Sequence, residues 1–169
     1  SEMCIRDSSM SASEMFWEQF SVGQAWTHHR DEALAQDEII AFAKQYDPLY
    51  MHTDPVQALS SPLGVHCASG VHTFALAQRM LCDALFSVTH VVAGHRIENF
   101  IMHRPVKPRD RLSLTAKVMN VSQHARRDDC GWVTLAIAVQ VAGTGSVLTY
   151  DLTVLIACLL YTSPSPRDS

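Results

Sequence analysis

The chain has 169 residues, a formal net charge of −4 at pH 7 and 47% hydrophobic residues. This length and this apolar fraction are typical of one domain with a proper core. The slightly negative charge, without any basic run, argues against nucleic acid or an anionic membrane as a partner. No segment reaches the ~20 apolar residues that a membrane span needs.

The two ends of the chain resemble translated adapter DNA. Residues 3–7 can be encoded by a DNA whose reverse complement, read one frame over, encodes residues 158–162. A sequencing adapter read through at both ends of a fragment gives this relation, and two natural disordered tails are the alternative. We therefore predict one domain over residues 9–157, with non-native tails at 1–8 and 158–169.

The first part of the domain is predicted to be an opening segment, a strand and a short helix. The opening segment, residues 16–24, ends in a turn at Val22-Gly23-Gln24, and a strand over residues 25–34 follows. Residues 37–45 place apolar side chains on one side at helical spacing, which predicts a short amphipathic helix.

Asp47 and His52 follow this helix, five residues apart, with Pro48 between them. At helical pitch the spacing puts the two side chains on different faces, and Pro48 disfavours a helical conformation at Asp47. We therefore predict an irregular loop in which a turn brings the carboxylate and the imidazole to one point. Such a pair suits acid–base chemistry.

Asp54-Pro55-Val56-Gln57 has the features of a helix start. Asp54 is the expected N-cap, Pro55 occupies the first helical position and Gln57 can cap in return. Asp54 is thus assigned to structure rather than to catalysis. The short helix is expected to end in the segment 60–64.

A long, almost wholly buried helix is predicted over residues 69–86, beginning at Ser69-Gly70. A helix start offers unpaired N–H groups and a partial positive charge, which suit an oxygen that gains negative charge in a reaction. His66 and His72 flank this start, but no third ligand is spaced to complete a metal site, so no metal is predicted.

The character of the chain changes to β from Val91 onwards. Strands are predicted over residues 92–102, 111–122, 131–141 and 146–157, with a hairpin turn at 142–145. Helices first and a β-meander afterwards is an α+β order. The cysteines inside the predicted domain show no Cys-x-x-Cys spacing, which predicts reduced thiols and a cytoplasmic location; these are Cys67, Cys82 and Cys130.

Over residues 16–157 the sequence resembles the MaoC-like family of acyl-thioester hydratases and dehydratases with the hot-dog fold. Three motifs carry the resemblance: Asp-x4-His-x-Asp from Asp47, Ser-x-x-Gly from Ser61, and Ala-Ser-Gly-x-His-Thr from Ala68. The resemblance implies an antiparallel sheet wrapped around one long central helix. It also implies a homodimer that joins two sheets edge to edge, and a reaction without a cofactor.

The resemblance further implies interconversion of a 2-enoyl thioester and its (3R)-hydroxyacyl thioester, carried by coenzyme A or an acyl carrier protein. Asp47 and His52 would activate the water, and the amide of Gly70 would form the oxyanion hole. The implied substrate-binding residues are Tyr50, Gly64, Ser69, His72, Arg104 and Lys107. Arg104 and Lys107 would meet the phosphates of coenzyme A, or else lie on a solvated turn.

The sequence departs from the family pattern at Gln78, where well-known members have serine, and at Arg109, where glycine is usual. The acyl group therefore stays open. Two alternatives also stay open: a hot-dog thioesterase, against which His52 argues, and a non-catalytic acyl-thioester-binding subunit, which has no need of the Asp47–His52 pair.

Overall fold

The computed structural model describes residues 14–159. In chain order the elements are η1 (Trp17–Gln19), β2 (Ala25–His29), α2 (Gln36–Tyr46), α3 (Tyr50–Thr53), α4 (Pro55–Ala58), α5 (Gly70–Ala84), η2 (Phe86–Val88), β3 (Val91–Met102), β4 (Leu112–Gln123), β5 (Cys130–Val141) and β6 (Gly145–Ala157). Their order confirms the predicted α+β class.

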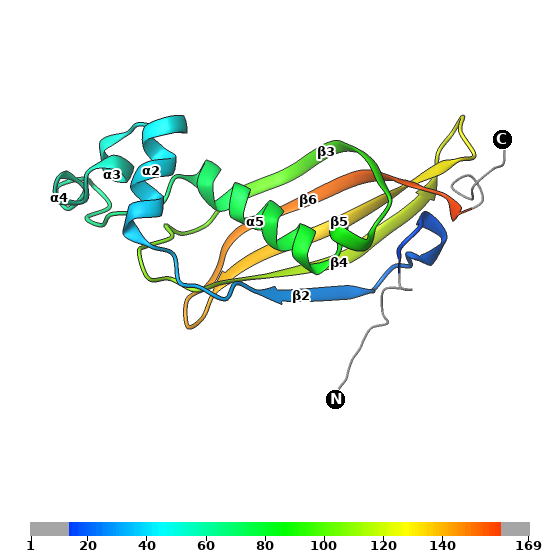
Figure 1. The fold of residues 1–169 in the computed structure, drawn as a ribbon, viewed down its shortest axis with the longest axis horizontal. Helices are drawn as coiled ribbons and strands as arrows, with labels where there is room; N and C mark the ends of the chain where they lie inside the picture. Colours follow the sequence, from blue (N-terminus) through cyan, green and yellow to red (C-terminus); the bar gives the residue numbers. More distant parts are fainter. Residues whose placement is uncertain (1–13, 160–169) are drawn as a thin grey trace.

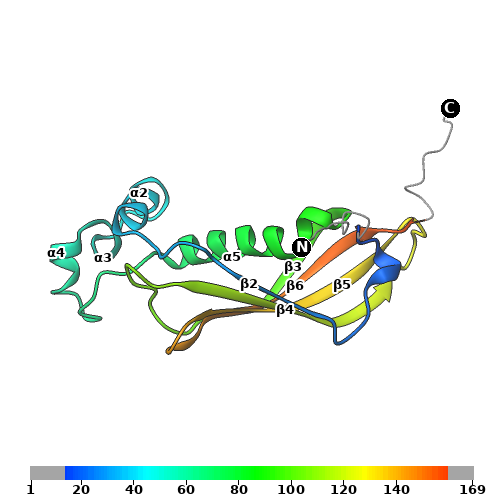
Figure 2. The same cartoon turned by 60° about the horizontal axis from the view of Figure 1, so that its bottom comes forward.

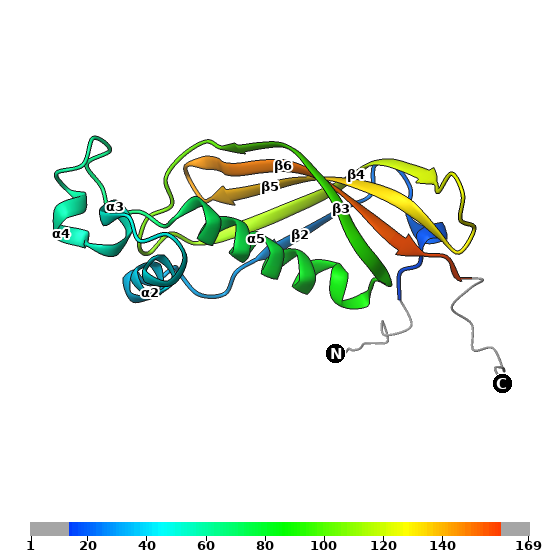
Figure 3. The ribbon, with the colours of Figure 1, turned by 90° about the horizontal axis from the view of Figure 1, so that it is seen from above.

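The strands form one antiparallel sheet in the order β2-β4-β5-β6-β3. Helix α5 runs along one face of this sheet, and no described helix covers the other face (Figures 1 and 2). Helices α2, α3 and α4 gather at the end of the molecule where α5 begins (Figure 3). The sheet and α5 thus form a rigid platform, and the three small helices surround the first turn of α5.

The core lies between α5 and the sheet. Buried residues of the helix, such as Ala77 and Leu81, belong to the same apolar cluster as Leu114, Leu135 and Tyr150 of the strands. Each fully buried leucine stabilises the fold by about 1.5–3 kcal/mol relative to an exposed one. Strand β5 alternates in burial because successive side chains point to opposite faces of the sheet.

The prediction of an almost wholly buried α5 is wrong. Val71 is 52% exposed, and Gln78 and Arg79 on the same helix are also exposed. The helix has the sheet on one side only, so it buries one face, and the many apolar residues of its sequence do not all reach the core.

The predicted strands from residue 92 onwards are confirmed within one residue, as is the turn at 142–145, where Thr144 N–H donates to the carbonyl of Val141. The strand predicted over residues 25–34 ends at His29 instead. After His29 the backbone bonds to the neighbouring segment at only two positions: Arg30 N–H donates to Leu112, and Leu34 both donates to Asp110 and accepts from Arg109 N–H. The bend at Asp31 separates these contacts.

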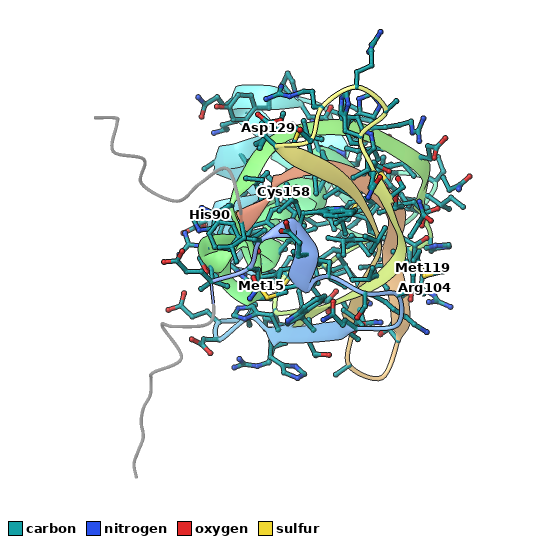
Figure 4. The ribbon with its side chains drawn as sticks, turned by 90° about the vertical axis from the view of Figure 1, so that its right-hand side faces the viewer. Met15, His90, Arg104, Met119, Asp129 and Cys158 are labelled. Carbon is teal, nitrogen blue, oxygen red and sulfur yellow. The ribbon has the colours of Figure 1, made fainter. Side chains whose placement is uncertain are left out.

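The C-terminal end of the described chain packs on the domain. Cys158 is buried, and its N–H donates to the carbonyl of Asp129 over 2.9 Å. These two residues lie with Met15 and His90 at the end of the molecule opposite α2–α4 (Figure 4). Cys158 and Leu159, assigned to the tail from sequence, therefore contact the domain, whereas residues 1–8 and 160–169 lie outside the described residues.

Gly131 is tightly covered by the indole of Trp17, whose Nε1–H donates to the carbonyl of Trp132 over 3.1 Å. A Cβ at Gly131 would overlap three atoms of that ring. We expect Gly131→Ala to lower the free energy of unfolding in urea by about 1–3 kcal/mol, because the ring must move. Gly94→Ala is the control, since its Cβ meets nothing within 4 Å. Equal midpoints for both variants would contradict this packing role.

Candidate active site

The backbone places Asp47 and His52 on two different elements beside the start of α5. Asp47 caps the C-terminus of α2, and its N–H donates to the carbonyl of Ala43. Pro48 then ends that helix, and the chain resumes helical structure at Tyr50 as α3, which carries His52. The predicted irregular loop is therefore only partly correct, because His52 lies in a short helix.

The carboxylate and the imidazole meet as predicted. Asp47 Oδ2 lies 3.7 Å from His52 Nε2, and both side chains are partly buried. This separation is too long for a strong hydrogen bond. It is short enough for both groups to contact one water molecule, so the pair can act on the same proton.

Ser69 fixes the carboxylate from the other side. Its hydroxyl donates to Asp47 Oδ2 over 2.5 Å and accepts from Val71 N–H over 3.2 Å. Ser69 is fully buried. One hydroxyl therefore caps α5 and orients the carboxylate, a role different from the predicted contact with substrate.

A backbone carbonyl determines which ring nitrogen of His52 carries the proton in the neutral form. The ring Nδ1 lies 2.7 Å from the carbonyl oxygen of Cys67. Because a carbonyl only accepts, Nδ1 must carry the proton, and in the neutral ring Nε2 is then the free acceptor facing Asp47. The geometry leaves His52 able to take a proton at Nε2.

His66 supports this arrangement, although sequence reasoning considered it only as a metal ligand. It is buried, and its Nε2 lies 2.7 Å from the carbonyl oxygen of His52. That contact ties the segment before α5 to α3. Among residues 14–159, no group of three or more His, Cys, Asp and Glu side chains is placed to hold a metal ion.

A cavity of about 290 Å³ lies at the first turn of α5, and neither Asp47 nor His52 lines it. Apolar groups dominate its lining: Leu63, Cys67, Ala68, Gly70, Thr73, Met102, His103, Arg104, Pro105, Val106, Val147 and Leu148. Cys67 lines the cavity and also contacts His52 Nδ1 through its carbonyl, whereas Ser69, which contacts Asp47, does not line it. The cavity can take an apolar group, and Cys67 connects it to His52.

The predicted binding residues divide into two groups. Gly70 and Arg104 line the cavity, although Arg104 also donates to the carbonyl of Ser146 over 2.9 Å. Ser69 and four other predicted substrate-binding residues do not line it. Tyr50 is 42% exposed on α3, Gly64 forms a turn with φ of 70°, the backbone N–H of Lys107 bonds to Asp110, and His72 stacks on Phe42 with 4.4 Å between ring centroids.

The buried position of His72 makes stability depend on pH. Burial lowers the pKa of His72 from its ordinary value of 6.5, with partial opposition from Glu38. The unfolded chain then binds the proton more tightly, so the full stability is present above about pH 6.5 and is lost as the pH falls. We expect His72→Phe to reduce the loss of unfolding free energy between pH 7 and pH 5 in urea titrations. The same loss in both proteins would contradict this role.

Solved structures with the hot-dog fold are similar to the chain over most of its length. They include a monoamine oxidase regulatory protein from Archaeoglobus fulgius (TM-score 0.77, 24% identity, covering 86% of this chain and 95% of that one). A MaoC-like dehydratase from Rhodospirillum rubrum has a TM-score of 0.75 (23% identity, 85% and 97% covered). An R-hydratase from Pseudomonas aeruginosa has a TM-score of 0.68 (18% identity, 86% of each chain). The fold is therefore the hot-dog fold.

The MaoC like domain family matches residues 18–141, and the chain belongs to this family. Membership places it in the general class of hydratases and dehydratases with this fold. YdeM, an uncharacterised protein of Bacillus subtilis (strain 168), is 26% identical over 139 residues, which are 82% of this chain and 96% of that protein. No helix in the described part of the chain is long and apolar enough to cross a membrane.

Proposed function

We propose that the protein adds water to a 2-enoyl thioester, giving the (3R)-hydroxyacyl thioester, or catalyses the reverse dehydration. The observation that carries this proposal is the approach of Asp47 Oδ2 to His52 Nε2, 3.7 Å apart at the first turn of α5. Membership in the MaoC like domain family supports it. The thioester would be one of coenzyme A or of an acyl carrier protein.

In this mechanism a water molecule binds between Asp47 and His52. One of the two takes a proton from the water as its oxygen bonds to C3 of the enoyl group. The proton then passes from the pair to C2, so both side chains return to their starting state. Water is consumed, and no cofactor is needed.

The amide of Gly70 would stabilise the enolate that forms between these two steps. A residue at the first helical position has no intrahelical partner for its N–H, and the helix start favours negative charge. Met102 lies so close to Gly70 that a Cβ there would overlap its sulfur. Since Met102 is 58% exposed and flexible, it can move when the thioester carbonyl enters.

We also propose a homodimer. Strand β3 is one of the two edge strands of the described sheet, and all twelve of its residues are exposed. An apolar exposed edge of this kind favours pairing with another strand. We expect light scattering at micromolar concentration to give twice the mass of the chain, and Ile101→Lys to shift it towards the monomer. Val22→Lys, an exposed site on the turn before β2, should not. A monomeric wild-type protein would contradict the dimer.

The proposed reaction can be tested with crotonyl-CoA and the purified protein. We expect the enoyl absorbance to disappear without release of free thiol. Thiol release would support the alternative of a thioesterase. Binding of the thioester with neither change would support a non-catalytic binding subunit.

A further inference from the structure

We propose that Phe74, Phe100 and Tyr150 form the closed end of the acyl pocket and restrict the substrate to short acyl chains. We call these three residues the aromatic floor. The inference rests on the proposed function, since it assigns the cavity beside Gly70 to the acyl group.

The three rings contact one another in every combination. The ring centroids of Phe74 and Phe100 are 5.2 Å apart, those of Phe74 and Tyr150 5.4 Å, and those of Phe100 and Tyr150 5.6 Å. Both pairs that include Phe74 are edge-to-face, which is a favourable geometry for aromatic pairs. The rings come from α5, β3 and β6, so they connect the helix to two strands of the sheet.

None of the three rings lines the cavity itself, but on each element the ring follows or precedes a lining residue by two to four positions. On α5, Phe74 is four residues after Gly70 and so lies on the same face, about 5.4 Å further along the axis. On β6, Tyr150 is two residues after Leu148 and points to the same side of the sheet. Gly70 and Leu148 both line the cavity.

On β3 an irregularity in pairing accompanies the third ring. Met102 lines the cavity and pairs with Leu148, whereas the register shifts between Glu98 and Ile101. Asn99 has φ of 54° within this shift. Phe100 thereby contacts Phe74 and Tyr150, although it belongs to an exposed edge strand.

The floor is fixed by the core. Tyr150 is only 2% exposed, and its hydroxyl has no hydrogen-bond partner among the described residues. Burial raises the pKa of this phenol, so it stays neutral at ordinary pH. An acyl chain therefore meets a packed aromatic wall about one helical turn from Gly70.

Binding of saturated acyl-CoA thioesters tests the floor without requiring catalysis. In an open apolar pocket each added methylene tightens binding about fourfold. We expect calorimetry to show that octanoyl-CoA binds the wild-type protein no more tightly than butyryl-CoA. In Phe100→Ala and Phe74→Ala, octanoyl-CoA should bind at least tenfold more tightly than it binds the wild type.

Two variants serve as controls. Tyr150→Phe keeps the ring and should keep the discrimination against octanoyl-CoA. Phe86→Ala removes the same kind of side chain from η2, beyond the far end of α5, and should not reduce the discrimination. Wild-type affinity that rises with every methylene from butyryl to octanoyl would overturn the proposal, as would equal relaxation by Phe86→Ala. If the wild-type protein does not hydrate crotonyl-CoA but still binds octanoyl-CoA no more tightly than butyryl-CoA, the proposed reaction is contradicted and the aromatic floor is supported.

Discussion

Asp47→Asn and His52→Ala should each slow the hydration of an enoyl thioester by about 100- to 10,000-fold, the usual contribution of a general acid or base. Asp47→Asn keeps the shape of the side chain but removes the charge that faces His52 Nε2. His52→Ala removes the acceptor nitrogen itself. Steady-state hydration rates with crotonyl-CoA measure both effects, and circular dichroism should show an unchanged fold, because neither side chain is part of the core.

The double variant should be little slower than either single one, because the two groups act on one water. Asp54→Asn is the matched control. Asp54 accepts from Val56 N–H and Gln57 N–H over 3.0 Å as the N-cap of α4, and asparagine caps almost equally well. Loss of activity in Asp54→Asn, with Asp47→Asn near the wild type, would show that the carboxylate has been misassigned.

Ser69→Ala should affect both stability and rate. Loss of the cap on Val71 N–H is expected to lower the free energy of unfolding by about 0.5–2 kcal/mol. A hydrogen bond to a charged group contributes about 1.5–3 kcal/mol, so the misplaced Asp47 carboxylate should slow hydration by roughly 10- to 100-fold. Urea denaturation and kcat for crotonyl-CoA measure the two effects separately.

Ser69→Gly separates the two roles of this hydroxyl. Glycine at an N-cap costs only a few tenths of a kcal/mol relative to serine, so stability should stay close to the wild type. The hydroxyl that orients Asp47 is still lost, and the rate should fall as in Ser69→Ala. A Ser69→Gly protein with the wild-type rate would mean that Ser69 only caps the helix.

Local features of the sequence predict much of the fold. Asp54-Pro55 predicts the start of α4, and the structure confirms both the cap and the proline. In β5 and the first half of β4, side chains alternate in burial along the strand, as expected for a sheet with one face on the core. The sequence also marks Arg109 as unusual, because the family has glycine at this position. The structure agrees, since Arg109 adopts φ of 75°, a region that favours glycine.

The site was harder to predict because its contacts join residues distant in sequence. Ser69 meets Asp47 across 22 positions, and His66 meets His52 across 14. No local pattern reports such pairs. His72 shows the opposite problem, in which closeness in sequence is misleading. Its position two residues after Gly70 predicts a contact with substrate, but two residues along a helix point in different directions, and His72 stacks on Phe42 instead.

The most direct test of the central claim is the hydration of crotonyl-CoA in ¹⁸O-labelled water, followed by mass spectrometry of the products. The Asp47–His52 mechanism predicts an intact thioester with one ¹⁸O atom in the hydroxyl group at C3. Label found in a free carboxylate, with unmodified carbons at C2 and C3, would contradict it, because the water would then have attacked the thioester carbonyl.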